Sequence, residues 1–314
     1  MSAQRPDTPI DAPEVPEVPD ALARRQIEGN AAGSRRRAWR ERAFQAVLYA
    51  ALAVSLVSLA ALLIDVIVKG APRLNAGILT NFPSSLPDQA GAQSAIMGTI
   101  WVVGMTALIC IPLGIGAAVY LEEYADSFRW YNRMIELNIQ NLAAVPSIVY
   151  GILGLGFIVR AAGFGQTVLA ASLTLSLLVL PILIISAREA IRAVPNSIRH
   201  AALALGATQW QAIRHQVLPG AIPGIATGSI LALSRAIGEA APLVLLGGLT
   251  FITFNPSGLN SQFTVLPIQI FNWISRPQEE FRVLAAAAIV VLLVILLVMN
   301  AAAIYLRNRY QRKW

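Results

Sequence analysis

The sequence predicts an all-α, polytopic helical membrane protein with six transmembrane helices. Hydrophobic residues make up 56% of the 314-residue chain and charged residues only 13%, whereas soluble domains carry nearer a quarter charged residues. Six stretches are long enough to cross a bilayer core as helices, which takes about 20 apolar residues. Too little charged sequence remains to build a water-facing surface, which excludes a large soluble protein with buried helices.

The six spans together predict one transmembrane domain over residues 43–306, with an inner loop at about 188–220. In chain order the spans are placed at Phe44–Val68, Ile96–Leu121, Leu137–Val159, Val168–Ala187, Ile222–Ile252 and Val283–Leu306.

The two ends of the chain differ from the spans in composition. Residues 1–42 hold the proline-rich acidic run RPDTPIDAPEVPEVPD and the basic run RRRAWRER. Neither has a periodic apolar face, so we expect a disordered cytoplasmic tail. The run RRRAW is compatible with a twin-arginine signal, but the first apolar run starts late and is longer than in a signal peptide. We therefore interpret RRRAW as a topological anchor. Residues 307–314 are expected to form a basic cytoplasmic tail.

Lysine and arginine predict the orientation of the spans. With the N-terminus inside, the inner segments hold 18 of the 24 basic residues and the outer segments hold five, while Arg235 lies within a span. The chain is therefore expected to have both termini in the cytoplasm. The high isoelectric point reflects this bias, and we expect no nucleic-acid partner.

Residues suited to metal binding or catalysis are scarce. Cys110 is the only cysteine and lies within a span, so neither an intramolecular disulfide nor a cysteine metal cluster is possible. The only histidines, His200 and His215, fall in the inner loop, where we expect no metal site. Neither lysine, Lys69 or Lys313, lies in a P-loop, and no H-E-x-x-H or G-x-S-x-G motif occurs. We expect no cofactor, no catalytic residue and no ATP hydrolysis by this chain.

The inner loop between the fourth and fifth spans is too long for a simple connection of two to eight residues. Its segment SIRHAALALG predicts a short helix with Ser197 as N-cap and Gly206 as C-terminal stop. A second short helix, ATQWQAIRHQV, is expected to end at Leu218 and Pro219. Small residues would let another protein approach closely: Ala201, Ala202, Ala204 and Ala207. Spacing alone leaves open whether this surface binds a partner or packs on its own subunit.

The segment HAALALGATQWQAIRHQVLP resembles the EAA loop of ABC importer permeases, which reads E-A-A, three residues, G, nine residues, I-x-L-P. The matching positions are Ala201, Ala202, Gly206, Leu218 and Pro219. His200 stands where glutamate is usual and Gln216 where isoleucine is usual, which puts a specific polar contact in doubt.

The resemblance implies a MetI-like ABC importer permease architecture. In that family the loop forms a coupling helix docked in a groove of a separate ATP-binding subunit, so this chain would be a transport subunit and not an enzyme. The implied coupling residues are Ala201, Ala202, Leu203, Gly206, Ala207, Leu218 and Pro219.

Three further segments resemble permeases of phosphate (Pst-type) importers: AIMGTIWVVGMTALICIPLGIGAAVYLEEYA, NLAAVPSIVYGILGLGF and ALSRAIGEAAPLVLLGG. The last is closer to the A-type half of the permease pair, and the similarity covers about residues 44–306. It implies an inner-membrane complex with a homologous C-type (PstC-like) permease subunit, two copies of an ATP-binding subunit, and a periplasmic or extracellular phosphate-binding protein.

One arginine and one glutamate stand in the otherwise apolar stretch LALSRAIGEAAPLV. Arg235 and Glu239 are four residues apart, so on a helix they share a face. A lone charge in a bilayer is costly, so the pair must face a cavity, a partner or each other. An arginine fork can donate two parallel hydrogen bonds to phosphate oxygens, and Glu239 can hold it when the site is empty. We therefore predict that both residues lie on the substrate pathway.

Other polar or flexible residues are candidates for lining that pathway. They are Gly238 beside the pair, and Asn141 and Ser147 in the third span. For the third-span residues, interhelical packing and hydrogen bonding explain the pattern equally well. The run GILGLG is expected to provide close helix packing, and the acids Glu122, Glu123 and Asp126 to form a solvated inner loop.

Three functions fit the sequence to different degrees. The first is half of an ATP-driven phosphate importer, and the second is an ABC permease for another oxyanion such as sulfate, molybdate or phosphonate. The third is a self-sufficient channel or secondary transporter, which would not need a loop that docks an ATPase. Only the three phosphate-type segments separate the first function from the second.

Overall fold

The computed structural model describes residues 20–126, 128–246 and 251–310, and the regular elements in these ranges are helical. They are α1 (Asp20–Gly70), η1 (Ala71–Arg73), α2 (Ala76–Thr80), α3 (Gln93–Val119), η2 (Tyr120–Tyr124), α4 (Trp130–Ala143), α5 (Ser147–Leu153), η3 (Gly154–Ala161), α6 (Val168–Arg192), α7 (Asn196–Ala204), α8 (Gln209–Ala212), η4 (Ile213–Val217), α9 (Leu218–Gly238), α10 (Ala241–Leu245), α11 (Leu266–Ile274) and α12 (Glu279–Tyr310). Element η1 is a 3₁₀ turn, and η2, η3 and η4 are π-helical.

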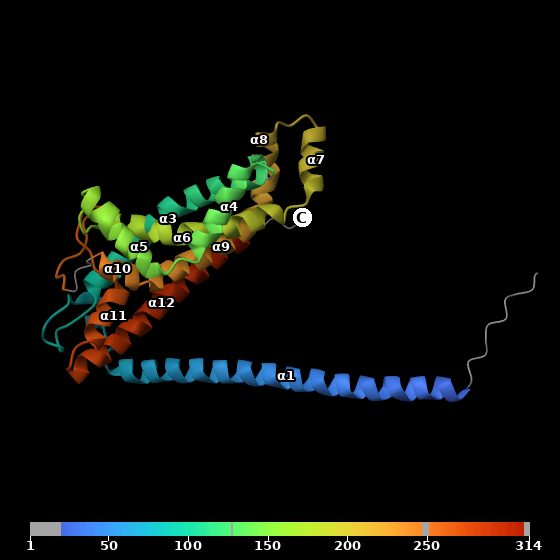
Figure 1. Cartoon of the computed structure of the whole chain (residues 1–314). Coiled ribbons are helices and arrows are strands. Elements are labelled where there is room, and N and C mark those ends of the chain that lie inside the picture. The colour runs from blue at the N-terminus through green and yellow to red at the C-terminus, as the bar shows by residue number, and fades with distance from the viewer. Residues whose placement is uncertain (1–19, 127, 247–250, 311–314) are drawn as a thin grey trace, which may run out of the picture. The chain divides into compact units, whose positions relative to one another are not determined.

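The chain divides into two units, Met1–Leu63 and Ile64–Trp314. The described part of the first unit is residues 20–63, which form most of α1. In the second unit α3 packs on α6, α6 on α9, and α9 on α12 (Figure 1). Helices α7 and α8 lie at one end of this bundle, and α10 and α11 at the other (Figure 1).

Membrane-length helices account for most of the fold. Five helices in the described ranges are long and apolar enough to cross a membrane, and one bent pair makes a sixth when it is counted as one span. This confirms the prediction of an all-α polytopic protein. Helices α3, α6 and α12 contain or closely match the second, fourth and sixth predicted spans.

Two predicted spans are interrupted. The third, expected at Leu137–Val159, consists of α4 and of α5 continued by η3, and the two parts are bent by 104°. Pro146 lies at the break, where it lacks an N–H and disfavours the helical conformation of the residue before it. The fifth, expected to run to Ile252, has its helix end at Gly238, because the ring of Pro242 would clash with the Gly238 carbonyl in a continuous helix.

The expected tail also differs from the structure. Helix α1 begins at Asp20, within the segment 1–42 for which a disordered tail was expected. Arginine and alanine make up about half of residues 20–42, and both favour helix without an apolar face. Residues 307–310 continue α12, while residues 1–19 and 311–314 lie outside the described residues.

The contact between α6 and α9 depends on small side chains. A Cβ added at Gly224 would lie 2.6 Å from Ala190 Cβ, and one added at Gly228 would lie 2.6 Å from Ser186 Cβ. The two glycines are four residues apart, as are the two small residues that they meet on α6. This spacing lets the helix backbones approach closely, as in small-xxx-small packing within membranes.

Polar side chains fasten α12 to α9. Ser234 Oγ donates a hydrogen bond to Asn300 Oδ1 over 2.8 Å, and Arg307 Nη1 donates to Thr227 Oγ1 over 2.9 Å.

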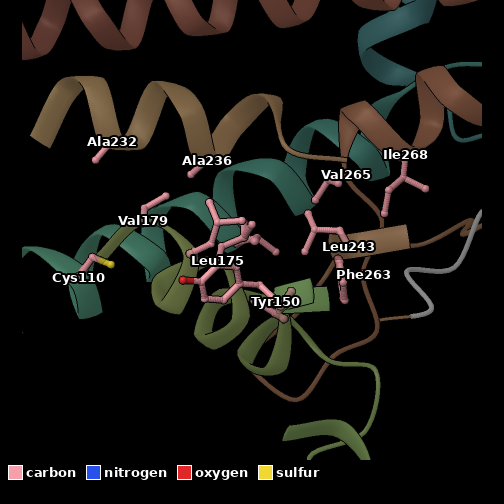
Figure 2. Packing of buried hydrophobic residues seen from close by; sticks show 14 of the residues in the cluster. Cys110, Tyr150, Leu175, Val179, Ala232, Ala236, Leu243, Phe263, Val265 and Ile268 are labelled. Atoms are coloured by element: carbon pink, nitrogen blue, oxygen red, sulfur yellow. The ribbon is translucent and has the colours of Figure 1, made fainter. Parts of the chain in front are cut away.

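Figure 2 shows the apolar core of the second unit, where Tyr150, Leu175 and Leu243 from three different helices point toward one another.

We predict that Gly228→Val destabilises the protein by about 1–3 kcal/mol, because the valine side chain would overpack the contact with Ser186. The measurement is the thermal midpoint of the detergent-extracted protein. Gly116→Val is the matched control, since a Cβ there meets nothing within 4 Å. Equal midpoints for the two variants would contradict the packing described for α6 and α9.

Candidate functional site

The inner loop forms a hairpin of two helices, α7 and α8. Gly206 ends the first of them. Helix α7 ends in a Schellman motif, in which Ala207 N donates to Ala202 O over 3.1 Å and Gly206 N donates to Leu203 O over 3.0 Å. Gly206 has a φ of +83°, which confirms it as the C-terminal stop. The predicted N-cap was wrong by two residues: Pro195 holds that position and no side chain caps the helix.

Helix α8 begins with a capping box and does not end where the sequence predicted. The Thr208 and Gln211 side chains each accept a hydrogen bond from the other's backbone N–H. The helix then continues through the π-helical turn η4 into α9. Pro219 stands in the first turn of α9, where its missing N–H is tolerated, so the expected end at Leu218 and Pro219 was wrong.

The hairpin exposes large apolar side chains. Leu203, Leu205 and Trp210 are 48%, 90% and 51% exposed. Between α7 and α8 lies a cavity of about 230 Å³, lined by residues that include Ala202 and Ala207. An apolar surface that surrounds a small hollow is typical of a protein-docking site.

Two of the predicted coupling residues lie elsewhere. Leu218 and Pro219 line a second, apolar cavity of about 790 Å³, whose other walls come from α3, α9 and α12. The structure therefore brings together Ala202 and Ala207, with Ala201, Leu203 and Gly206 exposed on the same hairpin, but not the Leu-Pro pair.

Ion pairs hold the hairpin and the end of α6 to the end of α3. Arg199 Nη2 on α7 lies 2.7 Å from Glu123 Oε1, and these side chains are only 16% and 8% exposed. Glu122 accepts two hydrogen bonds from Arg192, over 2.9 Å and 3.0 Å, and also pairs with Arg188. The interpretation of Glu122 and Glu123 as solvated was therefore wrong.

Asp126, the third acid of that group, is half exposed and pairs with Arg129 over 3.5 Å.

A signal in the sequence could have found the ion pairs of Glu122 and Glu123. Two adjacent glutamates directly follow a span on the side where arginines accumulate, in a chain with only 17 acidic residues. Glutamates in this position are expected to form ion pairs with the nearby arginines.

The histidines of the hairpin are placed as surface residues. His200, at the position where the resemblance expects glutamate, is exposed, and His215 Nδ1 lies 3.1 Å from Gln211 O. In the described ranges no group of three or more histidine, cysteine, aspartate or glutamate residues could hold a metal ion.

The second candidate region is the end of α9. Arg235 Nε donates to Glu239 Oε1 over 3.1 Å, which confirms that the two side chains meet on one face. The arginine side chain is 44% exposed and the glutamate 17%. Among the described residues the guanidinium makes no other hydrogen bond, so its two terminal amino groups are open to a ligand. A guanidinium in this state can donate a parallel pair of hydrogen bonds to an oxyanion.

The two interrupted spans meet beside this pair. A Cβ added at Gly151 of α5 would lie 2.7 Å from Pro242 Cα of α10, so these short helices are in close contact. On α5, the Tyr150 hydroxyl donates a hydrogen bond to Leu142 O over 2.8 Å, which ties α5 to the end of α4. A broken span is tolerated in a membrane where its backbone lines a cavity or is buried in protein.

The predicted lining residues have mixed outcomes. Gly238 is exposed, and a Cβ there would meet nothing within 4 Å, which fits an open region next to the pair. Asn141 is exposed near the end of α4, and Ser147 is partly buried at the start of α5. They flank the break in the third span, and their part in a pathway stays a prediction. Gly154, from the run GILGLG, packs closely on Thr174 of α6.

Helix α9 connects the two candidate regions. At a rise of about 1.5 Å per residue, Arg235 lies roughly 26 Å along α9 from Leu218. One continuous helical path therefore leads from the exposed hairpin to the open guanidinium.

Comparison with known proteins agrees with this geometry. Residues 110–312 match the family described as "Binding-protein-dependent transport system inner membrane component". The chain belongs to this family. It is a membrane-spanning transport subunit and not an enzyme, which confirms those two predictions.

Individual relatives fit the same family. The chain is 34% identical to the "Probable ABC transporter permease protein YqgI" of Bacillus subtilis, over 76% of this chain and 77% of that protein. It is 34% identical to the "Phosphate transport system permease protein PstA 1" of Mycobacterium tuberculosis, over 62% of this chain and 63% of that protein, which is just under two thirds of its length.

A solved structure supports the fold. A chain from a bacterial ABC transporter involved in the import of the acidic polysaccharide alginate has a TM-score of 0.58, covering 88% of this chain and 100% of that one. The identity is 18%, so this likeness shows the fold alone. It confirms the expected ABC importer permease architecture.

Proposed function

We propose that this chain is the A-type permease subunit of an ATP-driven phosphate importer. The observation that carries the proposal is the open guanidinium of Arg235, at one end of a helix whose other end leads into the exposed hairpin. A relative with the printed function of phosphate transport supports the substrate. The three phosphate-type segments in the sequence support it further.

The chemistry of the site follows from the paired charges. In the empty site Glu239 holds the Arg235 side chain by its Nε, which leaves the two terminal amino groups without a hydrogen bond among the described residues. A phosphate oxyanion would accept hydrogen bonds from these groups. Glu239 repels the same anion, which keeps binding weak enough for the anion to leave again.

The rest of the complex consists of other chains. A homologous C-type permease would complete the pathway, because one arginine supplies little positive charge for a divalent anion. Two copies of an ATP-binding subunit would dock on the hairpin surface of Leu203, Leu205 and Trp210 and its equivalent on the partner. A binding protein on the outer side would deliver phosphate, and both termini of this chain would lie in the cytoplasm.

Other oxyanions remain the second candidate substrate class, since an arginine fork also fits sulfate or molybdate. A stand-alone channel is disfavoured by the exposed apolar hairpin, which a protein without an ATPase partner has no reason to present to water.

We predict that Ala202→Asp detaches the ATP-binding subunit, because it places a charge in the wall of the hollow between α7 and α8. The permease should still reach the membrane at wild-type yield, while the amount of copurified ATP-binding subunit falls at least about tenfold, or ~1.4 kcal/mol. Glu189→Asp, a change of an exposed acid on α6 that keeps its charge, is the control. Normal copurification and transport in Ala202→Asp would show that the hairpin is not the dock.

We predict that Arg235→Gln abolishes phosphate transport and that Arg235→Lys impairs it substantially, because lysine keeps the charge but loses the fork. The decisive sample is the double variant Arg235→Gln with Glu239→Gln, which leaves neither charge unpaired. It should express and assemble, since replacing both members of a pair avoids the cost of a stranded charge. If this variant assembles and still transports phosphate, Arg235 is a structural partner only and the proposed contact fails.

A further inference from the structure

Glu123 lies where the second span reaches the hairpin. Helix α3 continues without interruption into the π-helical turn η2, and Glu123 is the fourth residue of that turn. Helix α3 itself packs on α6 and on α9. Whatever moves Glu123 therefore pushes directly on the central helices of the bundle.

The carboxylate of Glu123 holds the first helix of the hairpin. Arg199 on α7 donates to Glu123 Oε1 from both Nε and Nη2, over 2.9 Å and 2.7 Å. The guanidinium is fixed in addition by the carbonyl oxygens of Ile191 and Val194, over 2.9 Å and 2.6 Å. Because each donor group is used and both side chains are mostly buried, the orientation of α7 relative to the end of α3 is tightly constrained.

The backbone of the same residue holds the second helix of the hairpin. Gln209 Nε2, at the start of α8, donates to Glu123 O over 2.6 Å. One residue thus contacts both helices, through two different groups. The preceding residue, Glu122, pairs with Arg188 and Arg192 at the end of α6, just before α7 begins.

We infer that Glu123 is the mechanical joint of the permease, a positioning residue that makes the hairpin and the inner end of α3 move as one body. The inference rests on the proposed function, since it concerns how a docked ATPase moves the pathway. The hairpin is linked to α6 and α9 by the chain itself, but to α3 only by side-chain contacts. Without Glu123, α3 would keep its apolar packing on η4, where Ala118 and Val119 share a buried cluster with Ile213 and Val217, but would lose its hydrogen bonds to both helices of the hairpin.

The ion pair suits this role because it cannot open without cost. Separating Glu123 from Arg199 in a mostly buried site would leave two charges without partners or water. The pair therefore stays closed while the surrounding helices shift, which is what a rigid connection requires. An exposed pair would exchange with water and transmit little.

The test uses the complete complex with its ATP-binding subunits and measures the phosphate transported per ATP hydrolysed. In Glu123→Gln, an isosteric change, the ATP-binding subunit should still copurify and hydrolyse ATP, while this ratio falls roughly 5-fold or more. Arg199→Gln and the double variant should lower the ratio by the same factor, because either single change already breaks the joint.

Glu189→Gln is the matched control. It neutralises an exposed acid on the neighbouring α6 and should leave the ratio unchanged. An unchanged ratio in Glu123→Gln, losses that add in the double variant, or detachment of the ATP-binding subunit in Glu123→Gln would each overturn the inference. If Glu123→Gln does not accumulate, Gln209→Ala removes only the contact with the Glu123 carbonyl, and the ratio must then fall in that variant.

A distance measurement separates this inference from the choice of substrate. Spin labels at Ser197 and Tyr124, both exposed, report on α7 and η2 in a background where the single cysteine Cys110 is replaced by alanine. The inference expects one distance with and without ATP, and a broadened distribution when Glu123→Gln is added. A change of more than ~5 Å on ATP binding to the otherwise wild-type protein would overturn it, whether or not the complex carries phosphate.

Discussion

A charged side chain that leaves water must find a partner, and this requirement decides where most of the functional residues of this permease can lie. The chain has few charges, and two groups of ion pairs bear on its function. In η2, directly after α3, Glu122 and Glu123 meet three arginines of α6 and α7. At the far end of α9, Arg235 and Glu239 meet each other.

These two clusters differ in a way that matches different roles. The Glu123–Arg199 pair is mostly buried and its guanidinium is saturated with acceptors, so it fixes one helix against another. The Arg235–Glu239 pair is more exposed and leaves donor groups open, so it can exchange its internal partner for a ligand. Small residues on α6 and α9 bring the two helices into close contact between these clusters.

Periodic and compositional signals predicted much of the fold, because lipid imposes a length and an apolarity that a sequence shows directly. The sequence did not show that Pro146 and Pro242 break their spans, since proline is tolerated in many membrane helices and only the surrounding packing decides. The contact between Arg235 and Glu239 was predicted, because the two residues are four positions apart on one helix. The pairing of Glu123 with Arg199 was missed: the position of the two glutamates after a span indicates that they meet arginines, but the partner lies 76 positions away and no local pattern says which arginine it is.

The central claim is that this chain contributes half of an ATP-driven phosphate pathway and is inert without its partners. The most direct test compares proteoliposomes that contain this subunit alone with ones that contain the full assembly of both permease halves, the ATP-binding subunits and the binding protein. Uptake of labelled phosphate should occur only in the full assembly and only with ATP, and an excess of sulfate should not compete. Phosphate uptake by the subunit alone, or uptake by the full assembly without ATP, would contradict the account.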